Sequence, residues 1–319
     1  MLSDFAKTYY PLEFDTIHDE FKLVKETECK LMEFCTNVSM AEELERIMRG
    51  DIVGEAAHVA LEKTYRDHFI HSFQDFLTGT ILLDKFYGDF NNWYSPSLNL
   101  ELRTSVECSW LLTALFHDRF RPLLKLGELL GEKIPPGEDN SSKFACNLAS
   151  FYAHLSTGKT LESWSPTDAE SSSTLGTILL NHSNLGNHAA RGAFTILGYD
   201  LPIAAPTKYA AALAIALHDG DPRNDLLGSK ILPVKMEQFP LVVLLMYIDA
   251  AQEWNRTAGS KDELVDILLE NNQVVFVMDF SSAAANSHKA QEFESIARCI
   301  ISPISLGFAS SFSIGSGSA

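Results

Sequence analysis

The chain has 319 residues, enough to bury a sizeable core in one large domain or in two modest ones. Apolar residues make up 46% of the sequence and the mean hydropathy is close to zero, which indicates a soluble globular protein. The formal charge of −17 argues against a general nucleic-acid-binding protein, because phosphate backbones require clustered Lys and Arg side chains.

The N-terminus and the hydropathy pattern predict a cytoplasmic location. The first residues, Met-Leu-Ser-Asp-Phe-Ala-Lys, lack the basic and then apolar layout of a secretory signal. The apolar run of residues 241–247 is too short to cross a bilayer, so we expect no membrane association. The five cysteines show no Cys-x-x-Cys spacing, which argues against a disulfide framework and against a thiolate zinc site.

The first third of the chain is predicted to be helical. Residues 1–50 form a lead-in without chemistry of its own, and residues 52–87 form one long helix or two abutting helices. In this second stretch His68, His71 and Asp75 are spaced three and four residues apart, so they can share one face. A lone histidine on such a helix is more often structural than a ligand, and His58 is interpreted in that way.

Residues 104–117 are predicted to form a buried apolar helix that ends in His117 beside Asp118. The imidazole nitrogen and the carboxylate oxygen of this pair can reach one ion in the same pocket. Such pairs also occur by chance, so the other histidines of the chain decide its meaning. Further along, we expect a helix at 123–130, a loop at 131–142, a helix at 143–156 and a polar loop at 157–173.

Three further helices carry polar residues at suggestive positions. His188 begins a helix of small residues within 175–197, with Arg191 three positions later on the same face. The alanine-rich helix 207–217 ends at His218, which repeats the layout seen at His117. Asp249 interrupts the strongly apolar helix 239–256, where a buried carboxylate requires a cation or hydrogen bonds.

The last sixty residues change in character and predict a small α/β extension. We expect helices at 261–270 and 292–301 and strands at 273–280 and 304–314. The two strands would pair as a hairpin-like appendage. The predicted organisation is therefore a helical lead-in (1–50), a helical domain (51–260) and a C-terminal extension with a flexible tail (261–319).

Six residues with metal-coordinating side chains lie on or at the end of these apolar helices. They are His71, His117, Asp118, His188, His218 and Asp249. Imidazole and carboxylate ligands without thiolates suit divalent ions, with Fe or Mn favoured and Mg, Ni, Co or Zn as alternatives. Six such ligands are enough for one ion or for two adjacent ions.

The order of these residues resembles the HD-domain superfamily of metal-dependent phosphohydrolases over about residues 50–260. Residues 114–118, Ala-Leu-Phe-His-Asp, are similar to the defining His-Asp pair. Residues 244–254, Leu-Leu-Met-Tyr-Ile-Asp-Ala-Ala-Gln-Glu-Trp, are similar to the helix of the last aspartate, and residues 66–74 to that of the first histidine. The resemblance implies one ion on His71, His117, Asp118 and Asp249, and a second site completed by His188 and His218. His68 remains an alternative to His71.

The resemblance also implies the fold and the activity. We expect an all-α HD-domain helical bundle with a small C-terminal β-containing extension, and an enzyme that hydrolyses a phosphate ester or anhydride with a metal-activated water. Arg191 is expected to hold the developing negative charge, with Arg119 and Arg121 as alternatives. The expected catalytic residues are Asp118, Arg191 and Glu253, the last lying beside the metal ligands together with Gln252.

The expected partner is a small phosphorylated molecule such as a nucleotide, and the sequence is compatible with an oligomer. One alternative is a di-iron oxygenase, which the same ligand set supports in a minority of the superfamily. Another is a non-catalytic protein that senses a nucleotide, favoured by the unusual neighbours Arg119-Phe120-Arg121 and Asn187-His188-Ala189. A purely structural helical scaffold is the least favoured reading.

Overall fold

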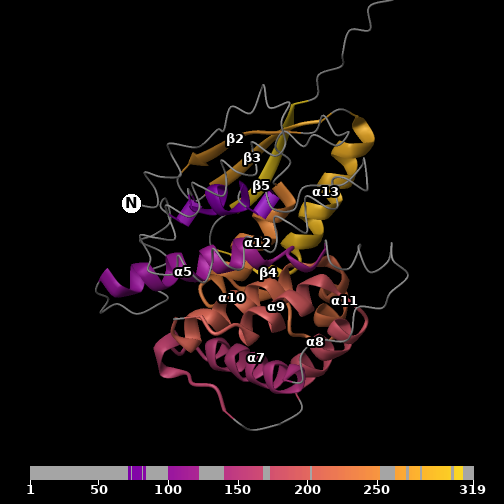
Figure 1. Ribbon diagram of the computed structural model, residues 1–319. Helices are drawn as coiled ribbons and strands as arrows, with labels where there is room; N and C mark the ends of the chain where they lie inside the picture. Colours follow the sequence, from indigo (N-terminus) through magenta and orange to yellow (C-terminus); the bar gives the residue numbers. More distant parts are fainter. Residues whose placement is uncertain are drawn as a thin grey trace, which may run out of the picture.

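Helices make up most of the structure, as the sequence predicts (Figure 1). The computed structural model describes residues 71–83 except 73 and 81, 100–121, 140–167, 173–251 except 202, 263–270, 273–280, 282–302 and 305–311. The described parts of 71–83 are helical. The other helices are α5 (Leu100–Phe116), α7 (Ser141–Ser156), α8 (Thr174–Asn184), α9 (His188–Gly198), α10 (Ala205–His218), α11 (Gly220–Gly228), α12 (Pro240–Ala251) and α13 (Ala283–Ala297), with a short 3₁₀ turn η1 (Leu161–Ser163). The predicted lead-in of residues 1–50 and the predicted helix at 123–130 lie outside the described residues.

Helix α10 forms the centre of the helical body. Pro206 lies in its first turn, where a missing backbone N–H costs nothing, and every residue from Tyr209 to His218 is buried. Alanine side chains along it let α5, α9 and α12 pack closely around it (Figure 1). The C-terminal end of α10 therefore lies deep in the molecule, and His218 is its last residue.

Helix 71–83 lies directly against α5. The indole Nε1 of Trp110 donates a hydrogen bond to the Phe76 carbonyl at 3.0 Å, and a Cβ atom on Gly79 would overlap the indole ring. Helix α9 also approaches α5 closely, since a Cβ on Gly192 would lie 3.1 Å from the Phe116 carbonyl oxygen. Gly79 thus lets helix 71–83 pack on the second half of α5, and Gly192 lets α9 pack on its last residue, beside His117.

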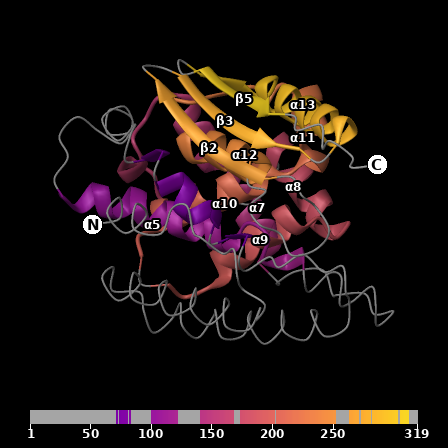
Figure 2. The same ribbon diagram turned by 90° about the horizontal axis from the view of Figure 1, so that it is seen from above.

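The C-terminal part contains a three-stranded sheet of β2 (Glu263–Glu270), β3 (Gln273–Asp279) and β5 (Ser305–Ser311). The strand order is β2-β3-β5; β2 and β3 are antiparallel, whereas β3 and β5 are parallel. Helix α13 supplies the crossover between the parallel strands, and Figure 2 shows it beside the sheet. Alternate residues of β3, namely Val274, Phe276 and Met278, face the core.

Three predictions for this region are wrong. Residues 263–270 form a strand, not the predicted helix, because their backbone pairs along β3 and tertiary pairing overrides local preference. The predicted strands at 273–280 and 304–314 exist but are parallel, and the hairpin joins β2 to β3 instead. The predicted helix at 292–301 begins earlier, at Ala283, because Ser282 caps it by accepting a hydrogen bond from the Ala285 N–H.

The sheet and its helix share one core with the helical body. Phe293 of α13 lies between Phe276 of β3 and Tyr247 of α12, with ring centroids 6.0 and 5.7 Å away. Two short strands that the sequence analysis did not predict, β1 (Val234–Lys235) and β4 (Ile300–Ile301), pair in parallel just before α12 and just after α13. The C-terminal residues thus contact both ends of α12, the helix of Asp249: β4 pairs with β1 just before it, and Phe293 packs on Tyr247 near its C-terminal end.

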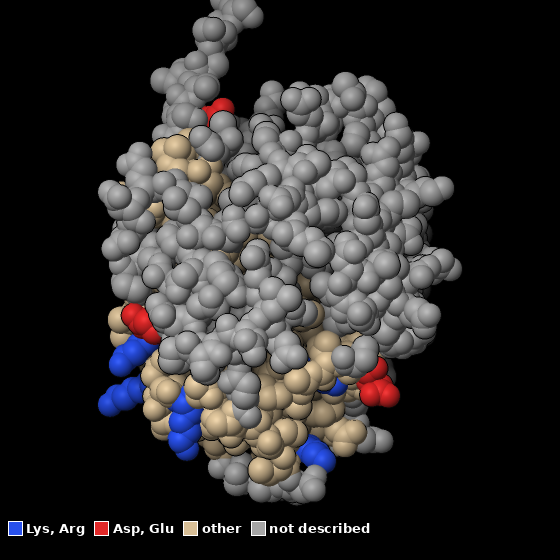
Figure 3. All heavy atoms as spheres, turned by 90° about the vertical axis from the view of Figure 1, so that its left-hand side faces the viewer, with Lys and Arg blue, Asp and Glu red and all other residues tan. Residues whose placement is uncertain are grey.

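The described part of the surface carries charges of both signs. On the face shown in Figure 3, Lys and Arg side chains project separately along the lower edge, with acidic groups to either side and uncharged surface between them. Within the described residues, no helix combines the length and the apolarity needed to cross a membrane.

Candidate metal centre

Five segments bring seven metal-coordinating side chains together inside the molecule. Helix 71–83, the end of α5, the start of α9, the end of α10 and the last turn of α12 each contribute. One group consists of His71, Asp75, His117 and Asp249, and the other of Asp118, His188 and His218. Within each group the ligand atoms lie within 4.8 Å of one another, so either group can hold a metal ion. All six residues predicted as ligands are among these seven.

Two of the histidines are oriented by the helices that they terminate. His117 Nδ1 lies 2.8 Å from the Ala114 carbonyl oxygen, and His218 Nδ1 lies 2.6 Å from that of Ile215. Each ring therefore donates from Nδ1 to the carbonyl three residues earlier, which directs its Nε2 into the cluster. His218 Nε2 is buried and has no hydrogen-bond partner among the described residues. A metal-binding histidine needs this arrangement, with one nitrogen held and the other presented.

The first group is compact around His71. Its Nε2 lies 3.0 Å from Asp249 Oδ1, 3.2 Å from His117 Nε2 and 3.6 Å from Asp75 Oδ2. His117 Nε2 in turn lies 3.3 Å from Asp75 Oδ2. His71, Asp75 and His117 are buried, and the Asp249 side chain is 24% exposed. Imidazole nitrogens and carboxylate oxygens therefore converge on one small volume.

The second group is joined to a guanidinium. Arg121 Nε lies 2.9 Å from Asp118 Oδ1 and 3.2 Å from His188 Nε2, which also lie 3.2 Å from each other. Asp118 and His188 are buried or nearly so, whereas the Arg121 side chain is 39% exposed. The guanidinium thus covers the second group at its exposed side.

The carboxylates dominate the electrostatics of this cluster. Burial lowers the pKa of His117, but the charges of Asp118, Asp249 and Asp75 outweigh burial and raise it to about 9. Burial acts to raise the pKa of Asp249, yet hydrogen bonds to His117 and His71 hold it well below its usual range. Burial lowers the pKa of His218 to about 4. The site as a whole favours positive charge close to its carboxylates.

A polar network of Asn187 and Asp219 lies at the Nδ1 side of His188. The Asn187 side chain caps α9 by accepting a hydrogen bond from the Ala190 N–H, and its Nδ2 donates to Asp219 Oδ2 at 2.6 Å. The same Asp219 oxygen lies 3.6 Å from His188 Nδ1. Asn187 therefore positions both the start of α9 and the carboxylate that faces the outer nitrogen of His188.

Arg191, which is predicted to hold the developing negative charge, contacts a backbone carbonyl outside the cluster. Its Nε donates to the Ser183 carbonyl at 2.9 Å, and its side chain is buried. Arg119 stacks over the rings of Phe116 and Tyr199, about 5 Å from each centroid. Arg121 is the one of the three whose recorded contacts are with the cluster.

Asp75 and Asp219 were not predicted as site residues. The spacing of Asp75 four residues after His71 places both side chains on one helical face, as expected from the sequence, but Asp75 was not selected as a ligand. Asp219 directly follows His218 and could have been found from the Asp118 pattern. His68, Gln252 and Glu253 lie outside the described residues. His182, which the sequence analysis did not select, pairs with the exposed Asp225 at 3.0 Å, away from the cluster.

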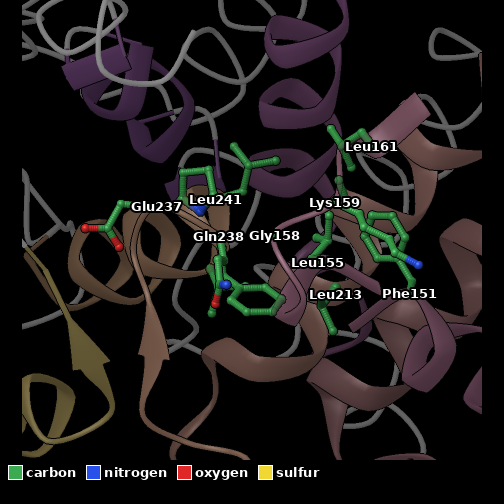
Figure 4. Close-up of a pocket in the computed structure, with 13 residues that line it drawn as sticks. Phe151, Leu155, Gly158, Lys159, Leu161, Leu213, Glu237, Gln238 and Leu241 are labelled. Atoms are coloured by element: carbon green, nitrogen blue, oxygen red, sulfur yellow. The ribbon is translucent and has the colours of Figure 1, made fainter. Parts of the chain in front are cut away.

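A separate cavity of about 250 Å³ lies between α7, η1, α10 and the start of α12 (Figure 4). Phe151, Leu155, Leu161 and Leu213 line it, with Lys159, Glu237 and Gln238 at its polar parts. None of its lining residues belongs to the histidine and aspartate cluster.

Comparisons of the chain with protein-family models, with curated proteins and with solved structures found no match.

Proposed function

We propose that this protein is a metal-dependent phosphohydrolase of the HD type, which cleaves a phosphate ester or anhydride in a small molecule such as a nucleotide. The observation that carries the proposal is the convergence of His71, His117 and Asp249 from three distant helices on one buried volume. The buried His-Asp pair at the end of α5 and the aspartate of α12 occur in the order typical of that superfamily.

The residues present fit a divalent ion. Asp75, Asp118 and Asp249 place three carboxylates in contact with His71 at 3.0 to 3.8 Å, and such a concentration of negative charge is costly without a cation. His71, Asp75, His117 and Asp249 would hold the ion, with neutral imidazoles and ionised carboxylates. A bound divalent ion supplies positive charge that polarises a phosphoryl group and makes water more acidic.

The protein side chains would bind and orient the substrate. Arg121 has a partly exposed guanidinium beside Asp118, which suits it to hold phosphoryl oxygens through paired N–H donors. Asp219, held by Asn187, faces His188 Nδ1 and would stabilise a proton on that atom. We therefore assign the charge-holding role to Arg121 rather than to Arg191.

The decisive experiment combines metal analysis with a substrate screen. The full chain, His117→Ala and the control His182→Ala would be reconstituted with Mn²⁺ or Fe²⁺ and assayed on phosphate monoesters, diesters and nucleoside triphosphates. We expect metal binding and hydrolysis in the wild type and in His182→Ala, and loss of both in His117→Ala with its helical circular dichroism retained.

Other outcomes would reject the proposal. Unchanged metal content in His117→Ala would place the ion elsewhere. Turnover that requires dioxygen would identify the oxygenase alternative. Tight nucleotide binding without hydrolysis, across several divalent metals, would identify a sensor.

A further inference from the structure

Arg121 contacts the second group of metal-coordinating residues directly. Its Nε–H donates to His188 Nε2 at 3.2 Å, and the same nitrogen forms an ion pair with Asp118 Oδ1 at 2.9 Å. His188 and Asp118 are two of the three residues of the second group. Only His218 of that group is not in contact with the guanidinium. Backbone geometry favours this position, because the Arg121 N–H donates to the Asp118 carbonyl at 2.9 Å and so holds both residues in one turn.

The hydrogen bond to His188 occupies the nitrogen that a metal would use. Because Nε2 accepts a hydrogen bond from Arg121, the neutral imidazole carries its proton on Nδ1, which is the atom that faces Asp219 Oδ2 at 3.6 Å. Neither nitrogen of His188 is then available as a ligand. Asp118 Oδ1 is engaged by the same guanidinium at 2.9 Å.

The balance of charge leads to the same result. The cluster holds the carboxylates of Asp75, Asp118 and Asp249, and a fourth, Asp219, lies 3.6 Å from His188 Nδ1. Arginine is charged at every accessible pH, so Arg121 balances one of them. A second divalent ion, on the second group, would lie beside the guanidinium, and the repulsion between two cations in a largely buried volume opposes its binding.

We infer that Arg121 is a built-in cation that takes the place of a second metal ion, so that the centre binds a single divalent ion on His71, Asp75, His117 and Asp249. This inference rests on the proposed function and narrows it. The arginine and the ion would face the substrate together, and the planar guanidinium suits a phosphoryl group with two adjacent anionic oxygens.

The test is the Mn²⁺ stoichiometry of the full chain, measured by elemental analysis and by the electron paramagnetic resonance spectrum. We expect one Mn²⁺ per chain and an uncoupled spectrum in the wild type. Arg121→Met removes the charge and the donors while keeping an unbranched side chain, so it should bind about two Mn²⁺ per chain and show exchange coupling between adjacent ions. Arg121→Lys, which keeps the positive charge, should stay at one.

Two further variants make the result specific. Arg119→Met is the matched control, since the neighbouring arginine stacks on Phe116 and Tyr199 and should leave the stoichiometry at one. Arg121→Met combined with His218→Ala should return to one ion, because the second group would lose its third ligand. Circular dichroism of each variant checks that the helical fold is retained.

Each contrary result has a defined meaning. Two Mn²⁺ in the wild type, or one in Arg121→Met, would overturn the inference and leave the proposed hydrolase standing. Failure of the wild type to bind any metal would overturn the inference and the proposed function together.

Discussion

Individual side chains in the cluster are held by groups that are not themselves ligands. His117 and His218 are fixed by carbonyls of their own helices, whereas His188 depends on Asn187 and Asp219. A ring nitrogen that is oriented in this way loses little conformational freedom when it binds a ligand, and such supporting contacts typically change affinity or activity 10- to 100-fold.

Replacement of Asn187 should separate its two roles. Asn187→Ala removes a helix cap, at a cost of about 1 kcal/mol, and also releases Asp219. Ser173→Ala is the matched control, because Ser173 caps α8 through the same contact with a backbone N–H but is not recorded in contact with the cluster. We expect similar losses in unfolding free energy, measured in urea, but a fall in turnover of roughly tenfold only in Asn187→Ala. Equal turnover in the two variants would show that Asn187 is only a cap.

The sequence identified the ligand residues better than their partners. Asp249 and His117 stand out because a polar residue in an apolar helix must be satisfied inside the protein. The choice between Arg191 and Arg121 could not be made, because helical spacing shows which face a side chain shares but not which carbonyl it reaches. The Ser183 carbonyl that binds Arg191 belongs to another helix, and only the packing of α8 against α9 brings it there.

At the scale of secondary-structure elements, the site depends on close helix packing at glycines. Helix 71–83 carries His71 and Asp75, and its distance from α5 is set where Gly79 meets the buried ring of Trp110. Protein interiors are packed too tightly to absorb extra atoms at such a crossing. A small displacement of this helix would move both of its metal-binding side chains.

Gly79→Ala should therefore be destabilising and should weaken metal binding. The added methyl overlaps the Trp110 ring, which predicts a loss of about 1–3 kcal/mol in unfolding free energy and a lower Mn²⁺ affinity. In the control Gly228→Ala the new methyl meets no atom within 4 Å, and stability should be unchanged or slightly higher. Urea unfolding and Mn²⁺ titration measure the two effects. Wild-type affinity in Gly79→Ala would show that the crossing does not set the ligand geometry.

Helices α5, α7, α10 and α12 were predictable from their apolar residues alone, whereas α11, which has a low apolar content, was not predicted. Strand β2 was not predictable either, since Glu-Leu-Val-Asp-Ile-Leu-Leu-Glu also fits a helix, and only its partner β3 decides the outcome. The parallel pairing of β3 with β5 likewise depends on α13 packing against Tyr247 of α12, a contact that no local pattern reveals.

Lys289 of α13 supports the helix end that carries Asp249. Its Nζ donates to the Ala250 carbonyl at 2.7 Å and pairs with Glu292 at the same distance. Lys289→Met should lower Mn²⁺ affinity several-fold, because the last turn of α12 loses this support. Lys208→Met is the matched control, since Lys208 makes the same kind of contact with the Tyr199 carbonyl at the end of α9. Equal Mn²⁺ affinities in the two variants would contradict a positioning role for Lys289.

For the molecule as a whole, the cluster joins the first described helix, 71–83, to α12, whose ligand Asp249 follows His71 by 178 residues. An ion that binds only the folded protein stabilises it by about 2.7 kcal/mol when present at a hundred times its Kd. We expect EDTA to lower the Tm of the Mn²⁺-loaded wild type by roughly 5 °C or more. His117→Ala should show no response to EDTA in the same calorimetric scan. A chelator effect of equal size in both proteins would mean that the ion binds at another place.

On the ribosome, α12 emerges well before the residues that hold its C-terminal end. Lys289 follows Ala250 by 39 residues, and β4 comes later still. At elongation rates of about 5–20 residues per second, several seconds pass between the synthesis of α12 and that of Lys289, which binds its C-terminal end. During that interval the apolar surface around Tyr247, later covered by Phe293, is open to solvent. We therefore expect metal loading to follow the synthesis of α13 and β4, and the nascent protein to depend on chaperones that shield this surface.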